Sequence, residues 1–251
     1  MLISGTIGWL VLLSGQAVLD VVFWRCVFGA ATLLLICARM GFLRRGLLNS
    51  HTFALIVLSG VAIVANWVLL FASYSRASIA IGTAVYNVQP FILLGLAALF
   101  LGERITLHKL AWLAVSFVGM LAIVSAHRGQ GESGSEYLLG IALALSAALM
   151  YAVAVLIIKR LRGIPPHLIA LIQVSTGALL LAPVANFTEL PAGTQAWGAL
   201  LTLGVVHTGL MYVLLYGAIQ KLPTALIGAL SFIYPIACLL YTSDAADEGL
   251  G

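Results

Sequence analysis

Several polar side chains lie inside long apolar runs of this sequence, where they could do chemistry. Arg25 is the only charged one well inside a run, about five residues into the stretch 20–40. A charge at the centre of a membrane helix costs roughly 2.5–3.5 kcal/mol on insertion scales, so it requires a reason. A guanidinium fork matches a carboxylate, which makes Arg25 a candidate contact for an anion. Two alternatives stay open: the side chain reaches the outer interface, or it pairs with Asp20.

Two prolines, Pro90 and Pro235, interrupt apolar runs at positions 145 residues apart. Each removes one backbone hydrogen bond, the one that the carbonyl of Tyr86 or Ser231 would normally accept. Interrupted helices at matched positions in two halves of a chain are typical of a binding site or a hinge. An ordinary packing kink is the alternative.

Around the first proline the run carries several polar groups. Thr83, Asn87 and Pro90 fall on one helix face, and Tyr86 with Gln89 on an adjacent one. Polar groups are costly when they face lipid, so these are expected to face the interior of a helix bundle. Hydrogen bonds between helices are the alternative role.

Further polar residues occur in matching parts of the chain. His207 lies one turn before Met211, which aligns with Asn66. A membrane histidine can relay protons, and a hydrogen-bonded structural group is the alternative. The full candidate substrate-binding set is Arg25, Asn66, Tyr86, Asn87, Gln89, Gln173, His207, Tyr212 and Tyr234, with Pro90 and Pro235 as hinge or helix-break residues.

The sequence offers little for other chemistry. Three scattered cysteines, Cys26, Cys37 and Cys238, give neither a disulfide framework nor metal-ligand spacing. We find no nucleophile–base pair and no paired carboxylates, so we expect no catalytic residue, no metal and no cofactor. No acidic residue lies in the middle of a run, which leaves His207 as the main group that could carry a proton near neutral pH.

Composition identifies the solvent of the fold. Of 251 residues, 63% are hydrophobic and only 8% are charged, and the mean hydropathy is +1.14. A soluble fold could not cover so much apolar surface with so few charges, which excludes soluble enzymes, nucleic-acid binders and disordered chains. We therefore predict an all-α polytopic membrane protein.

The apolar runs predict nine membrane spans, and basic residues predict their orientation. With the N-terminus in the cytoplasm, the inside loops hold nine Lys and Arg and the outside loops only Arg76 and Arg128. This bias predicts a multi-pass protein of the inner (cytoplasmic) membrane. The predicted spans are 1–15, 20–40, 52–74, 79–101, 108–126, 137–158, 167–185, 196–218 and 223–241.

An internal repeat divides the chain. Residues 68–90 and 213–235 share six of 23 positions at an offset of 145. The flexible connector 127–136 separates five spans from four, so the second half would be inserted upside down, as in secondary transporters with inverted repeats. Two five-span halves need ten spans, so we expect a C-terminally truncated second half and a non-native tail at 242–251.

The segment 77–106 resembles the fourth helix of the EamA family in the drug/metabolite transporter superfamily. It has the mid-helix Pro90 and ends in the turn Gly102-Glu103-Arg104. The stretch 23–35, with Arg25, resembles the family's second helix, and 228–240 its ninth. The resemblance implies a ten-helix carrier whose first repeat is 1–126 and whose second, incomplete repeat is 137–241. The chain departs from the pattern because it lacks the tenth helix and the second such turn.

The function expected from these observations is secondary transport. We predict a carrier, in the export direction, of small metabolites such as amino acids, working by alternating access around a midplane site between two inverted repeats. The alternatives are an integral-membrane enzyme and a structural or assembly membrane protein without transport activity. The expected partners are a small-molecule substrate and the lipid bilayer, with no nucleic acid; coupling to protons and a homodimer are left open. The exact substrate and the coupling ion do not follow from the sequence.

Overall fold

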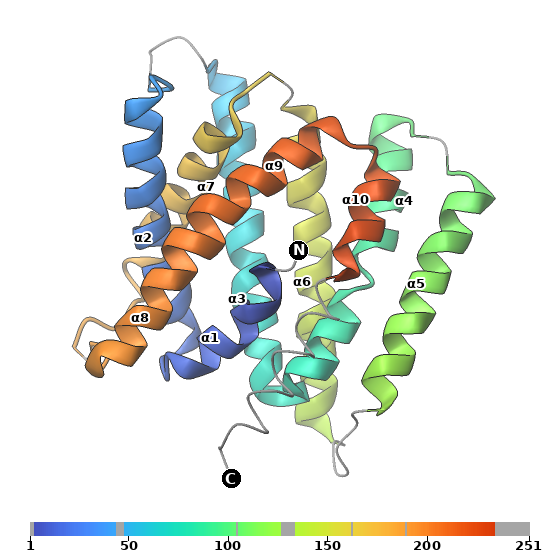
Figure 1. The fold of residues 1–251 in the computed structure, drawn as a ribbon, viewed down its shortest axis with the longest axis horizontal. Helices are drawn as coiled ribbons and strands as arrows, with labels where there is room; N and C mark the ends of the chain where they lie inside the picture. The colour runs from blue at the N-terminus through green and yellow to red at the C-terminus, as the bar shows by residue number, and fades with distance from the viewer. Residues whose placement is uncertain are drawn as a thin grey trace. The chain divides into compact units, whose positions relative to one another are not determined.

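The computed structural model of the chain describes residues 3–43, 48–103, 105–126, 134–161, 163–188 and 190–233. Every regular element in these ranges is a helix (Figure 1). The helices are η1 (Ile3–Thr6), α1 (Ile7–Leu13), α2 (Val18–Arg39), α3 (Ser50–Tyr86), α4 (Gln89–Leu101), α5 (Leu107–Ala126), α6 (Ser135–Arg160), α7 (Pro166–Leu181), α8 (Gly193–Gly204), the π-helical η2 (Val205–Leu210), α9 (Met211–Lys221) and α10 (Thr224–Ser231).

The all-helical prediction is confirmed, and so is the presence of helices that can cross a membrane. In the part of the chain that the structure describes, four apolar stretches are long enough to do so: Val18–Arg39, Ser50–Tyr86, Ser135–Arg160 and Gly193–Lys221. The last comprises α8, η2 and α9, which follow one another without a loop. Shorter apolar helices accompany them, among them α4 and α7.

Some helix boundaries differ from the predicted spans. The spans 52–74 and 79–101 become one element, α3, that turns sharply at Ala77 and Ser78, followed by a break at residues 87–88 and then α4. The predicted span 1–15 forms only a 3-10 turn and the short α1. Of the span 223–241, the part that the structure describes contains α10.

The described residues divide into two compact units. Unit 1 comprises the described residues of the stretches 1–9, 69–153 and 222–251, and unit 2 those of 10–68 and 154–221. Each unit therefore takes helices from both halves of the sequence.

Unit 2 is built around α2. This helix packs against α7, α8 and η2, while α9 packs against α7 (Figure 1). Asn49 caps the start of α3, because its side-chain Oδ1 accepts the N–H of Thr52 at 2.7 Å. Pro166 occupies the first turn of α7, where the missing N–H costs nothing.

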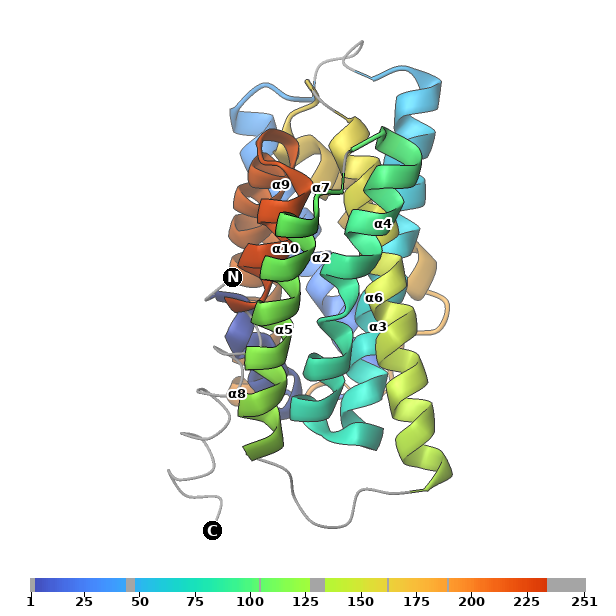
Figure 2. The same cartoon turned by 90° about the vertical axis from the view of Figure 1, so that its right-hand side faces the viewer.

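Unit 1 has α10 packed against α4 and α5, and Figures 1 and 2 both draw these helices side by side. Three phenylalanines join them: Phe91 of α4 meets Phe117 of α5 and Phe232, just beyond α10, edge-on at 5.5 and 6.5 Å between ring centroids. The helix α4 ends at Gly102, whose left-handed backbone (φ 65°) suits glycine. The Oγ1 of Thr224 donates to Glu103 Oε1 at 2.7 Å, which links the end of α4 to the start of α10.

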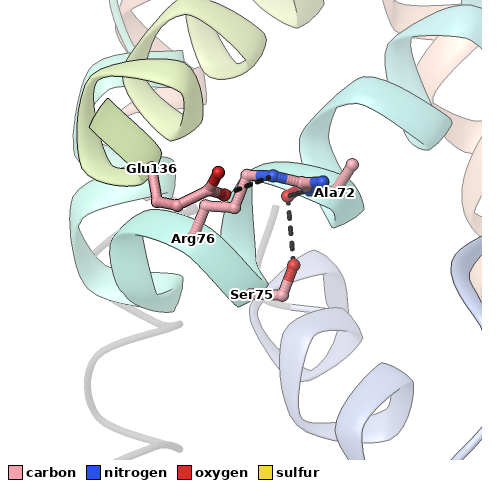
Figure 3. Close-up of polar contacts among 4 residues, drawn as sticks. All are labelled: Ala72, Ser75, Arg76 and Glu136. Carbon is pink, nitrogen blue, oxygen red and sulfur yellow. Dashed lines mark hydrogen bonds and ion pairs between the residues drawn. The ribbon is translucent and has the colours of Figure 1, made fainter. Parts of the chain in front are cut away.

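The start of α6 is joined to the sharp turn of α3 (Figure 3). Arg76 Nε lies 3.3 Å from Glu136 Oε2, and Arg76 Nη1 donates to Ala72 O at 2.9 Å. Both charged side chains are well exposed, so in water the pair would contribute no more than about 1 kcal/mol. Close packing adds to it, because a Cβ on Gly140 would lie 2.6 Å from that of Ala77.

Polar and apolar side chains are distributed as a bilayer requires. Arg25, Asn66, Asn87, Gln173 and His207 are all at most 3% exposed. Large apolar side chains lie on the outside instead, including Leu107, Trp112, Val115 and Val118 on α5. Polar groups inside and apolar groups outside are the arrangement favoured in lipid.

The backbone of Ser78 yields a stability prediction. Its φ of 60° and ψ of 160° lie in a region that is essentially reserved for glycine. Its Oγ receives only a long hydrogen bond, 3.4 Å from Ile81 N. Ser78→Gly should therefore stabilise the protein by about 1 kcal/mol, measured as a higher Tm in detergent.

The matched control is Ser75→Gly, three residues earlier on the helical side of the turn. There glycine should lower stability by about 0.5–1 kcal/mol, because the backbone is helical. A fall in Tm for Ser78→Gly equal to that of the control would contradict the strained turn.

Candidate functional site

Arg25 lies at the centre of unit 2 and is 1% exposed. Its Nε donates to Thr208 Oγ1 at 2.8 Å, and its Nη2 donates to the backbone carbonyl of His207 at 3.3 Å. Because the side chain is buried, it does not reach the outer interface. The carboxylate of Asp20 accepts the N–H of Asn186 at 2.7 Å, so the predicted alternative partner has its own structural contact.

The two groups that bind Arg25 come from the π-helical segment η2. In a π turn the backbone pairs residues five apart, and the side chains here do the same. Thr208 Oγ1 donates to Leu203 O at 2.9 Å, and His207 Nδ1 lies 3.1 Å from Thr202 O. Since a carbonyl only accepts, Nδ1 of His207 carries the proton in this contact. The hydroxyl of Thr208 is thereby oriented with its oxygen toward Arg25.

Two aromatic rings cover the guanidinium. Its carbon Cζ lies 4.1 Å from the ring centroid of Trp67 and 5.9 Å from that of Tyr212. Trp67 Nε1 donates to Tyr212 Oη at 2.9 Å, and the two rings meet edge-on. A cation over an aromatic face gains about 2 kcal/mol or more when water is excluded. Arg25 is thus oriented by a hydroxyl, a carbonyl and two rings, all of them neutral. We call these residues the arginine cage: Arg25, Trp67, His207, Thr208 and Tyr212.

A second polar group continues from the cage. The ring of Tyr212 meets that of Tyr216 at 5.0 Å. The hydroxyl of Tyr216 donates to Gln173 Oε1, and Gln173 Nε2 donates to Ser59 Oγ at 2.7 Å. Both ends of the Gln173 amide are therefore held by neighbouring helices. Gln173 in this way fixes the position of Tyr216 and of the Tyr212 ring that Tyr216 contacts.

Glycines allow the helices of unit 2 to approach closely enough for these contacts. A Cβ on Gly29 would lie 2.6 Å from the methyl of Thr208, and one on Gly60 would lie 2.9 Å from the Cα of Gln173. Small residues at such crossings let side-chain hydrogen bonds form between helices in a membrane.

Asn66, 2% exposed, lies on α3 in unit 2, and the other candidates that the structure describes belong to unit 1, at the break between α3 and α4. Tyr86 ends α3 and meets Tyr151 of α6 edge-on at 6.0 Å. Asn87 and Gln89 are 0% and 3% exposed, and Pro90 lies in the first turn of α4.

The structure thus gathers the predicted residues into two groups, one in each unit. Tyr234 and Pro235 lie outside the described residues. Unit 2 holds Arg25, Asn66, Gln173, His207 and Tyr212, and unit 1 holds Tyr86, Asn87, Gln89 and Pro90.

The sequence did not single out Trp67, although it makes the nearest ring contact to Arg25. A signal was available, because the offset of 145 that aligns the two halves pairs Trp67 with Tyr212. Thr208 and Tyr216 also belong to these groups and were absent from the candidate set. In the described ranges, no three His, Cys, Asp or Glu side chains come together as a metal site would require.

Comparisons with known proteins bear on what such a site does. The sequence model of the EamA-like transporter family matches residues 3–125 and 138–243. An uncharacterized transporter, YxxF, of Bacillus subtilis strain 168 is 26% identical over 96% of this chain and 77% of its own length. The pseudopaline exporter CntI of Pseudomonas aeruginosa is 26% identical over 74% of this chain and 63% of its own.

One solved crystal structure of a protein superposes on this chain with a TM-score of 0.81. The match covers 100% of this chain and 86% of the other, at 19% identity. At that identity the likeness is one of fold alone.

The close approach at Gly60 yields a prediction about the site's scaffold. Gly60→Ala would place a methyl group against the backbone of α7, at an overpacking cost of about 1–3 kcal/mol that outweighs the helix-propensity gain of alanine. We expect a lower Tm and weaker protection of Tyr216 and Gln173, measured by thermal unfolding and hydrogen exchange.

Gly95→Ala is the matched control in α4. No described atom lies within 4 Å of its Cβ position, so alanine should raise stability by about 0.5–1 kcal/mol. If both substitutions shifted Tm in the same direction, the crossing of α3 and α7 would not depend on Gly60.

Proposed function

Because this chain belongs to the EamA-like transporter family, we propose that it is a membrane transporter that binds the carboxylate of a small metabolite, such as an amino acid, through Arg25, and exports it. The observation that carries the proposal is the arginine cage. Burying a guanidinium that is 1% exposed in an apolar bundle costs free energy. A charged residue that is kept inside a membrane protein at this cost is a candidate for a functional role.

The cage suits a carboxylate for two reasons. The contacts of Arg25 with Thr208, the His207 carbonyl and the two rings are to neutral groups, so they orient the fork without cancelling its charge. A planar guanidinium also presents donors in pairs that match the two oxygens of a carboxylate. In an environment of low dielectric constant this attraction is much stronger than in water.

We propose alternating access between two inverted repeats, 1–126 and 137–241, as the mechanism. The two separate matches of the family model support two repeats. Contacts inside unit 2 support a two-fold axis that relates the two repeats. Residues near a two-fold axis contact their own counterparts in the other repeat. Trp67 and Tyr212 are counterparts at the offset of 145, and they hydrogen bond to each other.

Arg25 and Gln173 are paired by a second alignment, at an offset of 148. It places Gly29, Ala30 and Leu33 on Gly177, Ala178 and Leu181, and it aligns Arg25 of α2 with Gln173 of α7. Arg25 bonds to η2, in the third predicted span of the second half, and Gln173 bonds to Ser59 on α3, in the third span of the first half. This exchange of partners is the pattern that an inverted repeat produces, with a substrate site where the repeats meet.

The name of a relative supports export, and the distribution of charge supports the orientation of the chain. The Pseudomonas aeruginosa relative is named as an exporter, although this chain spans less than two thirds of it. The excess of Lys and Arg in alternate loops supports an N-terminus in the cytoplasm of the inner membrane. A cytoplasmic amino acid would then bind from the inside.

The test is counterflow of radiolabelled amino acids, individually assayed, into proteoliposomes that contain the purified chain. Arg25→Gln should reduce counterflow at least tenfold, because a hydrogen bond to a charged group contributes about 1.5–3 kcal/mol. Arg25→Lys keeps the charge but loses the planar pair of donors. Its counterflow should therefore lie between that of the unsubstituted chain and that of Arg25→Gln. Arg39→Gln, at the exposed end of the same helix, is the matched control and should transport as the unsubstituted chain does.

A second arm removes the carboxylate from the substrate instead of the arginine from the protein. In the unsubstituted chain, the amide of a transported amino acid should inhibit transport much less than the acid does. In Arg25→Gln, the amide and the acid should inhibit transport equally. Full transport by Arg25→Gln, or equal competition by acid and amide in the unsubstituted chain, would remove Arg25 from substrate binding.

A further inference from the structure

The break between α3 and α4 in unit 1 contains two buried oxygens that receive no hydrogen bond from the described residues. Asn87 and Gln89 are 0% and 3% exposed. No donor in the described part of the chain reaches Asn87 Oδ1 or Gln89 Oε1. Neither atom belongs to the arginine cage, and the proposed function does not use them.

The orientation of the Asn87 amide is fixed by its neighbour. Its Nδ2 donates to the backbone carbonyl of Thr83 at 2.7 Å. Turning the amide over would place its oxygen against that carbonyl, and two acceptors repel each other. The side chain therefore directs its oxygen, not its nitrogen, away from α3.

The backbone of the break supplies no donor to compensate. Pro90 has no N–H, and the N–H groups of Phe91 and Ile92 both bond to Val88 O, at 3.0 and 3.3 Å. The Asn87 N–H is directed back to the carbonyls of Thr83 and Ala84. The N–H groups of Asn87, Phe91 and Ile92 are thus used within the helices, while the two amide oxygens remain.

Buried acceptors of this kind are costly, which points to a ligand. Leaving a buried acceptor unsatisfied costs about 1–3 kcal/mol, so two of them call for a donor or a cation that the described residues do not supply. In transporters, interrupted helices expose backbone carbonyl oxygens to coupling ions, and an amide side chain at such a break offers an oxygen of the same neutral chemistry.

The charge of the site selects the class of cation. The carboxylates of unit 1 that the structure describes are engaged elsewhere, Glu103 with Thr224 and Glu136 with Arg76. Divalent ions in proteins depend on carboxylates, whereas neutral oxygens are sufficient for an alkali ion. A primary ammonium group, with three donors and one charge, meets the same requirement.

We propose that the α3–α4 break is a binding site for a monovalent cation, either an alkali ion or a protonated primary amine, held by Asn87 Oδ1 and Gln89 Oε1. An alkali ion would act as a coupling ion, and an ammonium group would be part of the cargo. Both are monovalent cations that neutral oxygen atoms can bind at this site. The proposal stands independently of Arg25, because its residues belong to the other unit.

The experiment is a cation titration of the purified full chain in detergent, followed by thermal unfolding at constant ionic strength. Choline chloride is replaced stepwise by NaCl, KCl or methylammonium chloride. Choline carries a charge but cannot donate from nitrogen and is too large for close coordination. A bound cation should raise Tm in a saturable manner by about 2–4 °C.

Substitutions assign the effect to the break. Asn87→Leu and Gln89→Leu should each abolish the cation-dependent rise, while Gln195→Leu, an exposed amide on α8, should leave it intact. Gln89→Glu keeps an oxygen at the site and adds a negative charge, so it should lower the half-saturating concentration about tenfold. It also tests the site if the leucine variants fail to fold.

The outcomes separate the possibilities. A rise with Na⁺ or K⁺ identifies the alkali ion, and a rise with methylammonium alone identifies the amine of the cargo. If no cation raises Tm above its value in choline chloride, the oxygens are satisfied by water and the proposal is overturned. It is also overturned if the rise persists in both leucine variants, or if Gln89→Glu binds no more tightly. None of these measurements requires transport, so failure here and failure at Arg25 can be told apart.

Discussion

A buried guanidinium is the constraint on which unit 2 depends. Arg25 cannot be left in an apolar bundle without partners, and the groups around it come from three separate elements. The segment η2 gives a hydroxyl and a carbonyl, α3 gives the ring of Trp67, and α9 gives the ring of Tyr212. One charge on α2 therefore fixes how three other segments must pack. The same charge is what makes the unit suitable for an anionic cargo, so its structural and proposed functional roles have one physical origin.

Departures from regular helix occur where polar atoms are needed. The π turn of η2 orients the hydroxyl of Thr208 and the carbonyl of His207 toward Arg25. The break before α4 places the amide oxygens of Asn87 and Gln89 in the protein interior. Regular helices would satisfy their own backbone groups and present only side chains. Since lipid offers no hydrogen bonds, such irregular backbone is tolerated only where the protein surrounds it. The polar residues of both irregular segments meet that requirement, because His207 and Thr208 of η2 and Asn87 and Gln89 of the break are at most 3% exposed.

Glycine positions connect the sequence to this packing. Gly29 and Gly60 lie at crossings where an added methyl group would collide with the opposite helix. The polar contacts of Arg25 and Gln173 form next to these crossings, because side chains bridge helices only when the backbones are near. Hydrophobicity alone, which is nearly uniform along the chain, does not specify which helices become neighbours. The pattern of small and polar residues supplies that information.

The helical class, the membrane setting and the burial of most polar groups follow from the sequence, because they depend on apolar run length and on the cost of a polar group in lipid. The bounds of the spans follow less closely, since two predicted spans join in α3. The sequence placed Asn87 and Gln89 inside the protein, as the structure does, and left open whether Arg25 reaches the outer interface. It could not give the partners of those groups. That Trp67 covers Arg25, that Gln173 is held at both ends, and that α3 turns at Ser78 follow from contacts between segments far apart in the chain. Only the tertiary structure decides such contacts, since many pairings of similar apolar helices satisfy the same hydrophobic pattern.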